Sequence, residues 1–429
     1  MLDIKLLREN PTECEAKLKT KDPSASLSEI LELDTSVRKR KTEVEELKSK
    51  RNSSSKMIGE MKRNGEDTSD LMAEIGGIGD TIAEIDAIIR HDEERLNDLI
   101  AHLPNFPDPV AKVAEDPAEN VEVKRVGEKP TFNFPMKNHV ELNESLDLFD
   151  FKRGAKISGS GWPIYKGLGA QLEWALIQYM ISIHIKNGFT QWMTPLLVRP
   201  EIMHGSAQLP KFKGQFYELQ DDDNDLYLVP TAETALNGLH RDEILDMNTL
   251  PYKYVAYTPC FRREAGAAGA QERGLIRVHQ FNKVELFSFC RPDQSEEMFN
   301  TIVSSAEEIL NGLGLHYRNM LLVTGDMSFS ASKTIDIEAW LPGQDRYYEV
   351  SSVSNCTDFQ ARRSKIRFKD ADGKTQFVHT LNGSGLATSR LMVALLENNQ
   401  QEDGSVIIPE VLRPYLGGVS ALTPKEVHA

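Results

Sequence analysis

Two long heptad patterns near the N-terminus constrain the fold of this chain more than any other feature. Apolar residues recur at alternating spacings of three and four over residues 30–61, and again over 71–103. This spacing is typical of helices that pack along a shared seam. The residues between the patterns, RNGEDTSD, are turn formers and offer Ser69 or Asp70 as a helix cap. Because the two patterns are equally long, they predict an antiparallel helical arm over about residues 27–103, roughly 50 Å in length.

The heptads also predict which residues of this arm face each other. Folding the chain at the turn pairs Met61 with Leu71 and, in the same register, Arg40 with Asp92. A polar pair inside an apolar seam commonly fixes register and adds little net stability. We therefore expect a salt bridge between Arg40 and Asp92. Several glycines lie near the tip and each weakens a helix by about 1 kcal/mol against alanine, so the greatest disorder of the arm is expected between about residues 54 and 80.

Charge is divided unevenly between the two predicted helices. The first carries RKRK and KSKR, whereas the second is largely acidic. One interpretation is a solvated face of a coiled coil, as most charge runs are. The other is a basic stripe that contacts a phosphate backbone, with Lys48, Lys50 and Arg51 as candidate phosphate-binding residues. The sequence leaves both interpretations open.

Bulk composition excludes several classes of protein. The 429 residues include 65 acidic and 50 basic side chains, which argues against a globally basic DNA binder. Four widely separated cysteines form no CxxC, so neither disulfides nor zinc are expected, and a reduced cytoplasm fits best. No apolar run approaches about 18 residues, so no membrane span is expected. The proline-rich HLPNFPDPV predicts a boundary between an N-terminal domain, 1–109, and a second domain, 110–429.

The second domain mixes helical and strand patterns without regular βα alternation, which favours an α+β fold on an antiparallel sheet. A long helix ends at Gly188 and is followed by a strand interrupted at Pro195. DRYYEVSSVSN reads as a strand, and TLNGSGLATSRLMVALLENNQ as a Gly/Ser turn that leads into an apolar helix carrying Arg390. Neither GxxxxGK[ST] nor GxGxxG after a strand is present, so the common nucleotide loops are excluded.

One stretch, FRREAGAAGAQERGLIRVHQFNKVELF, reads as two antiparallel strands joined by a Gly/Ala-rich connection. Alternation places Arg262 with Glu264 on one face, and Arg277 with Phe281 and Glu285 on one face at even spacing. Polar groups gathered on one sheet face either meet water or a charged ligand. The other face, which includes Val284, is expected to join the core.

These pieces together resemble the class II aminoacyl-tRNA synthetases. FRRE followed by Arg277 and Phe281 is similar to motif 2, GLATSR is similar to motif 3, and the helix and strand ending at Pro195 are similar to motif 1. TAET, FRREAG, RVHQFNKVE, EVSSVSN, DFQARR, TLNGSGLA and RPYLGG, together with the helical arm, resemble the bacterial-type seryl-tRNA synthetase family over essentially the whole chain.

The resemblance implies an antiparallel sheet of six to seven strands that binds ATP, with Mg²⁺ and without zinc. It implies a cytoplasmic homodimer that charges tRNA-Ser with serine, with tRNA-Sec left open as a second substrate. The catalytic residues would be Arg262 and Arg390. Residues placed at serine would be Thr231, Ala232, Glu233, Arg262, Glu285 and Ser384. Residues placed at ATP would be Arg262, Arg263, Glu264, Arg277, Val278, Phe281, Glu349, Val350, Ser351, Ser352 and Arg390, with Glu349 and Ser352 on Mg²⁺.

Two stretches depart from the family pattern. Gly161-Trp162-Pro163 stands where Arg-Phe is usual, and Ser389 stands where glycine is common before Arg390. We expect the first to alter local packing near motif 1 and neither to touch a group that binds substrate. Two alternatives also stay open: a class II synthetase for another small amino acid such as threonine, and a non-catalytic paralogue that keeps the arm for RNA binding.

Overall fold

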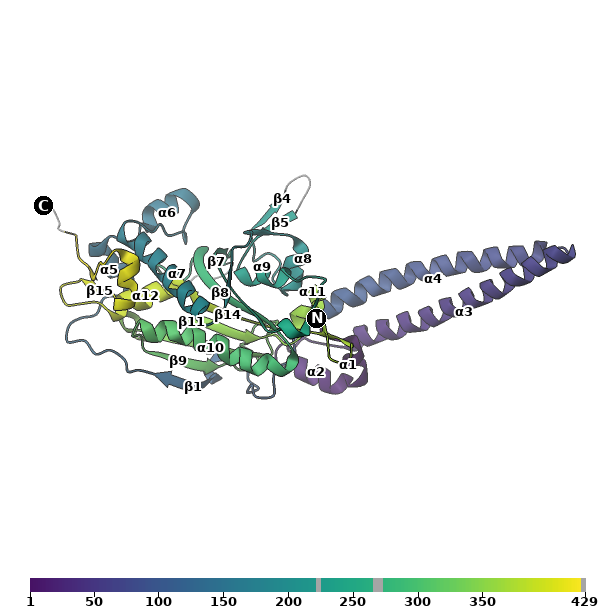
Figure 1. The fold of residues 1–429 in the computed structure, drawn as a ribbon, viewed down its shortest axis with the longest axis horizontal. Helices are drawn as coiled ribbons and strands as arrows, with labels where there is room; N and C mark the ends of the chain where they lie inside the picture. The colour runs from purple at the N-terminus through teal and green to yellow at the C-terminus, as the bar shows by residue number, and fades with distance from the viewer. Residues whose placement is uncertain (221–224, 265–272, 426–429) are drawn as a thin grey trace. The chain divides into compact units, whose positions relative to one another are not determined.

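The structure is a computed structural model that describes residues 1–220, 225–264 and 273–425 (Figure 1). The chain divides into two compact units, Leu2–Leu103 and Pro104–Ala429, the second of which includes Met1. The connection predicted between the strands of FRREAGAAGAQERGLIRVHQFNKVELF falls largely on residues 265–272, outside the described residues.

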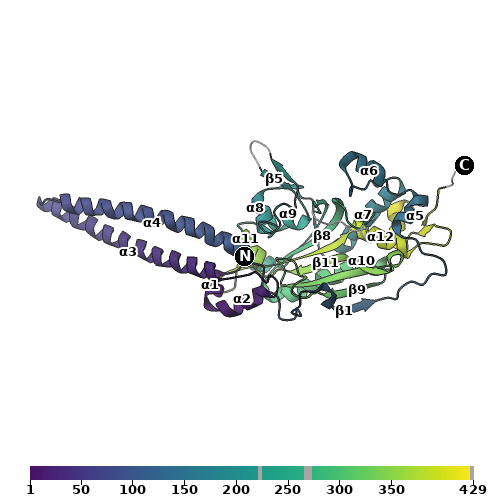
Figure 2. The ribbon, with the colours of Figure 1, turned by 180° about the vertical axis from the view of Figure 1, so that it is seen from behind.

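The first unit is helical and contains the predicted arm. Its helices are α1 (Ile4–Glu9), α2 (Pro11–Lys19), α3 (Ser28–Asn64) and α4 (Ser69–Ala101). Helices α3 and α4 run side by side in both views (Figures 1 and 2). Helix α3 is followed by Gly65, whose φ of 77° suits glycine at the end of a helix. The predicted caps of α4 are wrong by one residue or more, since Thr68 occupies the N-cap position and Asp67 accepts the Ser69 backbone N–H.

The predicted register of the arm is confirmed. Its seam is a cluster of buried aliphatic side chains that come from both helices, namely Val37, Val44, Ile78, Ile82 and Ile89, with Leu47 and Ile85 packed against them. Between Val37 and Val44 along α3, Arg40 Nη1 lies 2.6 Å from Asp92 Oδ2. On the flank, Lys41 pairs with Glu93 at 2.6 Å. The heptads therefore predicted both the fold of the arm and its one polar seam contact.

The second unit is built on a mixed sheet that has eight strands within the described residues. Their order is β1-β9-β10-β11-β14-β8-β7-β2. The strands are β1 (Val121–Val126), β9 (Tyr317–Leu321), β10 (Lys333–Leu341), β11 (Arg346–Asn355), β14 (His379–Ala387), β8 (Gln280–Cys290), β7 (Tyr252–Phe261) and β2 (Thr190–Trp192). All neighbours are antiparallel except β2, which runs parallel to β7 at the edge. The antiparallel α+β prediction is confirmed, while the implied six to seven strands undercount the sheet.

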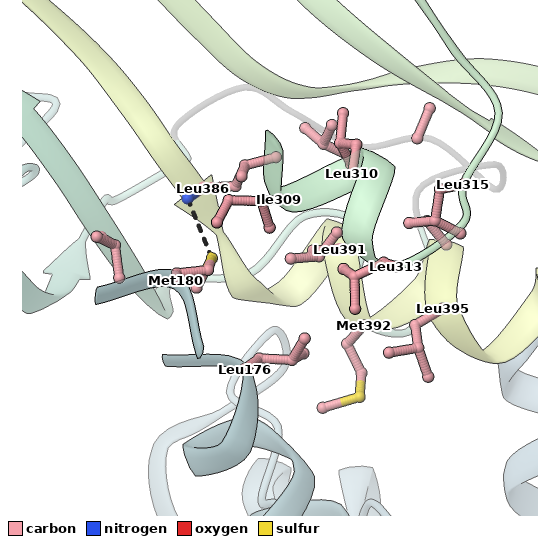
Figure 3. Close-up of a cluster of buried hydrophobic side chains, with 14 of the residues drawn as sticks. Leu176, Met180, Ile309, Leu310, Leu313, Leu315, Leu386, Leu391, Met392 and Leu395 are labelled. Atoms are coloured by element: carbon pink, nitrogen blue, oxygen red, sulfur yellow. Dashed lines mark hydrogen bonds between the residues drawn. The ribbon is translucent and has the colours of Figure 1, made fainter. Parts of the chain in front are cut away.

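Three helices cover one face of this sheet. They are α7 (Leu168–Lys186), α10 (Ser295–Gly312) and α12 (Thr388–Asn398). Their apolar residues form the main core with alternate residues of the central strands, such as Val284, Leu286 and Val353. Figure 3 shows part of this core, where the Leu386 backbone N–H at the end of β14 donates to the Met180 sulfur of α7 at 3.2 Å, and Leu391 of α12 belongs to the same cluster. The large apolar side chains of the helices are thus buried on a single side of the sheet.

The opposite face is covered only in part. Helices α8 (Pro200–Gly205), α9 (Ala232–Gly238) and α11 (Phe359–Ser364) lie on this side, where Ala232, Leu236 and Ala361 pack on Phe287 and Phe289. Further elements are α5 (His139–Leu146), α6 (Phe151–Ser158), β3 (Leu197–Val198), β4 (Glu218–Gln220), β5 (Asp225–Leu228), β6 (Ile244–Leu245), β12 (Arg367–Lys369), β13 (Thr375–Phe377), β15 (Val406–Ile407) and β16 (Ala421–Leu422). The part of this face left uncovered is where a site can form.

The Gly/Ser turn expected before Arg390 is wrong. Residues His379–Ala387 form the central strand β14, paired with β8 and β11. Its glycines are explained by close packing, since a Cβ on Gly383 would lie 2.6 Å from Ile302 and one on Gly385 would lie 2.4 Å from His184. A small residue can therefore mark a crowded strand as well as a turn.

Three smaller findings bear on the sequence analysis. The strand predicted to break at Pro195 does so, because β2 and β3 on either side of it belong to different sheets. No helix among the described residues is long and apolar enough to cross a membrane. All four cysteines are buried free thiols.

Candidate active site

The uncovered face of the sheet is organised by the hairpin of β7 and β8. On β8, Phe281, Lys283 and Glu285 project to this face, while Val284 and Leu286, on either side of Glu285, are buried on the helical face. Arg262 lies just beyond β7, and its guanidinium stands over the Phe281 ring at 5.1 Å. Even spacing along one strand therefore gathers an aromatic ring and charged groups on one surface.

Arg277 is not part of the strand that its spacing suggested. Strand β8 begins at Gln280, so Arg277 lies in the turn before it. The side chain still reaches the same surface, where its Nε lies 2.6 Å from Glu264 Oε2. Glu264 has a φ of 46°, a left-handed conformation uncommon for a non-glycine residue. The predicted grouping of Arg262, Glu264, Arg277, Phe281 and Glu285 is thus present, although the strand alone does not produce it.

This surface is the floor of a cavity of about 520 Å³. The predicted site residues that line it are Thr231, Glu233, Arg262, Glu264, Arg277, Glu285, Glu349, Ser352 and Ser384. An adjoining recess adds Val278, Phe281 and Arg390. Of the other predicted site residues, Ala232, Val350 and Ser351 are buried within their elements, and Arg263 bonds the carbonyl of Gly214. Lys48, Lys50 and Arg51 belong to the helical unit.

One end of the cavity is cationic. Arg390, in the first turn of α12, donates from Nη1 to the Glu349 backbone oxygen at 2.9 Å and to Glu349 Oε2 at 2.8 Å. Its Nε donates to the carbonyl of Ile276 at 3.4 Å. The guanidinium also lies 5.2 Å from the Tyr348 ring. These contacts hold Arg390 beside Arg277, which follows Ile276 in the chain.

The other end of the cavity is anionic and buried. Glu233 accepts from Gln360 Nε2 at 2.6 Å and from Asn382 Nδ2 at 3.2 Å. Glu285 accepts from the same Asn382 at 3.4 Å and lies 2.6 Å from Lys283 Nζ. Burial, followed by the neighbouring Glu285, raises the pKa of Glu233 to about 7, and Lys283 opposes this rise. Two neighbouring carboxylates in a buried cavity wall form a site suited to a small cation.

Local structure explains how Glu233 reaches this position. Strand β5 leads through Pro230 to Thr231, whose hydroxyl caps α9 by accepting the Glu233 backbone N–H at 3.2 Å. The cap places Thr231 and Glu233 at the N-terminus of the helix, both within the cavity wall. The strand and helix expected from DLYLVPTAETALNGLH are confirmed.

Sequence reasoning missed the three residues that bond the carboxylates of Glu233 and Glu285. Lys283 has the same even spacing as Phe281 and Glu285, which could have identified it. Asn382 was overlooked because its segment was interpreted as a turn. Gln360 comes from α11, more than 100 residues from Glu233, and no local pattern signals that contact.

The departure at Gly161-Trp162 packs on motif 2, a contact that the expectation of altered packing near motif 1 did not include. The Gly161 carbonyl accepts the His279 backbone N–H at 2.9 Å, and the Trp162 ring stacks on the His279 ring at 5.5 Å. His279 in turn accepts the Arg262 backbone N–H at 2.9 Å. The second departure, Ser389, lines the cavity beside Arg390. Both departures therefore lie at or beside elements that line the cavity.

Comparisons with known proteins agree with this architecture. Residues 215–399 match the family model "tRNA synthetase class II core domain (G, H, P, S and T)", and residues 1–107 match "Seryl-tRNA synthetase N-terminal domain". The chain is 55% identical to a serine–tRNA ligase of Chlamydia felis over 99% of this chain and 100% of that protein. It is 56% identical to the Chlamydia abortus protein of that name, again over 99% and 100%.

Two solved structures share the whole fold. One is a seryl-tRNA synthetase from Pyrococcus horikoshii complexed with ATP, with 39% identity, a TM-score of 0.94 and coverage of 99% of this chain and 100% of that one. The other is a cytoplasmic serine–tRNA ligase from Naegleria fowleri in complex with AMP, with 28% identity, a TM-score of 0.89 and coverage of 99% of each chain. By sequence over its full length and by fold, the chain belongs to the seryl-tRNA synthetase family of class II aminoacyl-tRNA synthetases.

Proposed function

We propose that this protein activates serine with ATP, forming seryl-adenylate and pyrophosphate, and then transfers the seryl group to the 3′-terminal ribose of tRNA-Ser. The observation that carries the proposal is one cavity with a buried carboxylate pair at one end and arginines at the other. This polarity suits an amino acid ammonium beside a polyphosphate. The family membership and the ATP and AMP complexes of its two structural neighbours support the same reaction.

The phosphate end is assigned to Arg262, Arg277 and Arg390. When the serine carboxylate attacks the α-phosphate, negative charge builds on the phosphate oxygens, and fixed cations stabilise it. Arg262 lies between the two ends of the cavity, so we assign it to the α-phosphate and the serine carboxylate. Adenine is assigned to the Phe281 ring, with Glu264 accepting from its amino group.

The serine end is assigned to Thr231, Glu233, Glu285 and Ser384. A carboxylate pair can hold the ammonium group, and a small hydroxyl can bond the hydroxyl of serine. Threonine carries one more methyl group, which a closed pocket can exclude, whereas alanine leaves a hydrogen bond unmade. These contacts are the basis of the proposed amino acid selectivity.

Magnesium is assigned to Glu349 and Ser352, and the residues fit the ion. Both side chains line the cavity and both offer oxygen. The described residues contain no cluster of three or more acidic, histidine or cysteine side chains that could hold a metal. Mg²⁺ commonly takes only one or two protein oxygens and completes its shell with substrate phosphates and water. Bound there, it would neutralise phosphate charge that the arginines leave uncompensated.

We assign tRNA binding to the N-terminal domain, residues 1–109, and catalysis to residues 110–429. Lys50 pairs with Glu74 at 2.7 Å and Lys48 with Asp86 at 3.6 Å, yet the two lysine side chains keep 59% and 47% of their exposure. Such exposed pairs are weak, so each lysine can exchange its carboxylate for a phosphate. The arm's basic flank, including Arg51, is therefore proposed to meet tRNA-Ser, with tRNA-Sec as a second candidate.

A cytoplasmic homodimer is proposed through motif 1. Strand β2 is the edge of the main sheet, and large apolar side chains near it are exposed, namely Trp174, Ile185 and Met193. An exposed apolar group beside an unpaired strand edge favours a second copy of the chain. Sedimentation of the purified protein distinguishes a dimer from a monomer.

Amino-acid-dependent exchange of pyrophosphate into ATP tests the proposed function. Serine should support exchange and threonine should not, which separates this enzyme from a neighbouring class II synthetase. A second arm of the experiment removes residues 27–103 behind a short linker. This variant should keep exchange and lose charging of tRNA-Ser, because the ATP and serine cavity lies wholly in the later residues. No exchange with any amino acid would favour the non-catalytic paralogue.

A further inference from the structure

His139 lies outside the cavity but is bonded to the turn that carries Arg277. It is the first residue of α5, and its side chain is only 3% exposed. The Leu275 backbone N–H donates to His139 Nε2 at 3.2 Å in a buried position. Arg277 follows two residues later. The ring is therefore in direct contact with the backbone of motif 2.

The second ring nitrogen is bonded to motif 3. His139 Nδ1 lies 3.1 Å from Oε1 of Glu397, the penultimate residue of α12, and the His139 backbone N–H donates to the same oxygen at 3.0 Å. Glu397 also accepts from the Gly343 backbone and from Gln344 Nε2. Two backbone N–H groups and one side-chain amide therefore donate to this buried carboxyl group, which acts as a fixed acceptor. His139 Nδ1 faces the same acceptor.

These two bonds select one form of the ring. Since Leu275 N–H is a donor, Nε2 must be a bare acceptor, and the single ring proton must sit on Nδ1. A second proton would lie on Nε2, directed at the Leu275 N–H. The neutral Nδ1–H tautomer is therefore the form that bonds both motifs.

The turn between Gly274 and Arg277 is built around this ring. Gly274 has a φ of 72°, and a Cβ placed on it would lie 2.1 Å from His139 Nε2. Leu275 and Ile276 are buried, and the Ile276 carbonyl accepts from Arg390 at the first turn of α12. Helix α12 thus holds this turn at two points, directly through Arg390 and indirectly through Glu397 and His139.

We propose that His139 is a positioning residue that supports ATP binding. Its ring holds the 274–277 turn in place, so that Arg277 and Arg390, which is bonded to the Ile276 carbonyl, keep their positions at the phosphates. The inference rests on the proposed phosphate role of Arg277 and Arg390. His139 touches no cavity residue that is assigned to serine. Its loss should therefore raise the KM for ATP and leave the KM for serine unchanged.

Two substitutions separate the two ring bonds. The amide of asparagine ends near the position of Nδ1, so His139→Asn can donate to Glu397 but offers nothing to Leu275. The amide of glutamine reaches the position of Nε2, so His139→Gln can accept from Leu275. In serine-dependent pyrophosphate exchange, we expect His139→Asn to raise the KM for ATP roughly five- to tenfold, the range for one lost hydrogen bond. His139→Gln should stay within about twofold of the unsubstituted protein, since it keeps that bond.

His316→Asn is the matched control. His316 is also buried and bonded through both ring nitrogens, but to the Val126 carbonyl and the Tyr347 hydroxyl. Its loss should lower Tm without a selective change in the KM for ATP. Equal KM values for ATP in His139→Asn and the unsubstituted protein, or equal losses in His139→Asn and His139→Gln, would overturn the inference. Absence of exchange by the unsubstituted protein would instead refute the proposed function.

A measurement that needs no active variant tests the tautomer. Ring ¹⁵N shifts of histidine-labelled protein at neutral pH should show His139 protonated at Nδ1 and bare at Nε2. The assignment uses the signal that disappears in His139→Gln. A ring protonated at Nε2, alone or at both nitrogens, would contradict the Leu275 bond and with it the proposed role.

Discussion

Replacing Glu233 with glutamine should stabilise the catalytic domain while it weakens serine binding. Glu233 is 7% exposed, and its pKa is raised to about 7, chiefly by burial and next by Glu285. In the unfolded chain the same carboxyl has an ordinary pKa of 4.5. A difference of this size corresponds to about 3 kcal/mol of destabilisation when the group is ionised in the folded protein.

The pH dependence follows from the sign of this difference. Because the folded pKa lies above the unfolded one, Glu233 contributes full stability below pH 4.5 and loses it as pH rises to about 7. Glutamine does not ionise, so the stability of the variant should resemble that of the unsubstituted protein near pH 5 and exceed it at pH 8. Its amide oxygen can keep the bond from Gln360, but its NH₂ faces Asn382, which reduces the gain to about 1 to 3 kcal/mol. Thermal unfolding should then show a Tm higher by roughly 2 to 6 °C at pH 8.

The same change should raise the KM for serine by roughly 10- to 100-fold, because a hydrogen bond to a charged group contributes about 1.5 to 3 kcal/mol. The KM for ATP should not change. Glu173→Gln is the matched control, since burial also raises the pKa of Glu173 to about 7 and its bonds are to Thr388 and Asn282, outside the cavity wall. Glu173→Gln should make the protein more stable at pH 8 without changing the KM for serine. A Glu233→Gln protein that is less stable at pH 8 and has an ordinary KM for serine would refute the argument.

Three further predictions concern the phosphate end, the serine hydroxyl and the arm. Arg262→Ala and Arg390→Ala should each raise the activation free energy of pyrophosphate exchange by roughly 2 to 4 kcal/mol, since phosphate charge is left uncompensated. Exchange near the unsubstituted rate would contradict the assignment of these arginines to the phosphates. Ser384→Ala should weaken the binding of serine far more than the binding of alanine as a competing ligand, because only serine loses a hydrogen bond. Equal losses of affinity would show that Ser384 does not bond the hydroxyl of the serine substrate. Hydrogen exchange in the arm should be fastest over residues 54–80, and Gly77→Ala should slow it, since a Cβ there meets open space; a tip as protected as the main sheet would refute this.

Local periodicity was sufficient to predict the arm. In a coiled coil, the position of a residue in the heptad repeat determines whether it faces the partner helix. Once the turn between the helices is located, the partner of each seam residue follows. The salt bridge between Arg40 and Asp92 was therefore predictable from the sequence. The caps were not, because several neighbouring residues near 68 can all begin a helix, and small differences in local bonding decide among them.

In the catalytic unit, the sequence alone indicated the α+β class and, through resemblance, the motif 2 arginines. Alternation along β8 predicted that Phe281 and Glu285 share a face, because side chains in a strand alternate. The same rule placed Arg277 in the strand, which is wrong, since that strand begins at Gln280. Glycines in residues 379–387 suggested a turn, but crowding by neighbouring elements, which sequence does not display, explains them.

The tertiary structure alone decided the contacts between distant segments. Gln360 and Asn382 reach Glu233 across more than 100 residues, and the separation between His139 and Glu397 is larger still. These partners form hydrogen bonds because a buried polar group without one is costly. That cost arises only once the layers have packed and buried the group. The sequence thus determined the elements, the arm's register and the family, while packing decided which buried groups bond, and with that the pKa of Glu233 and the tautomer of His139.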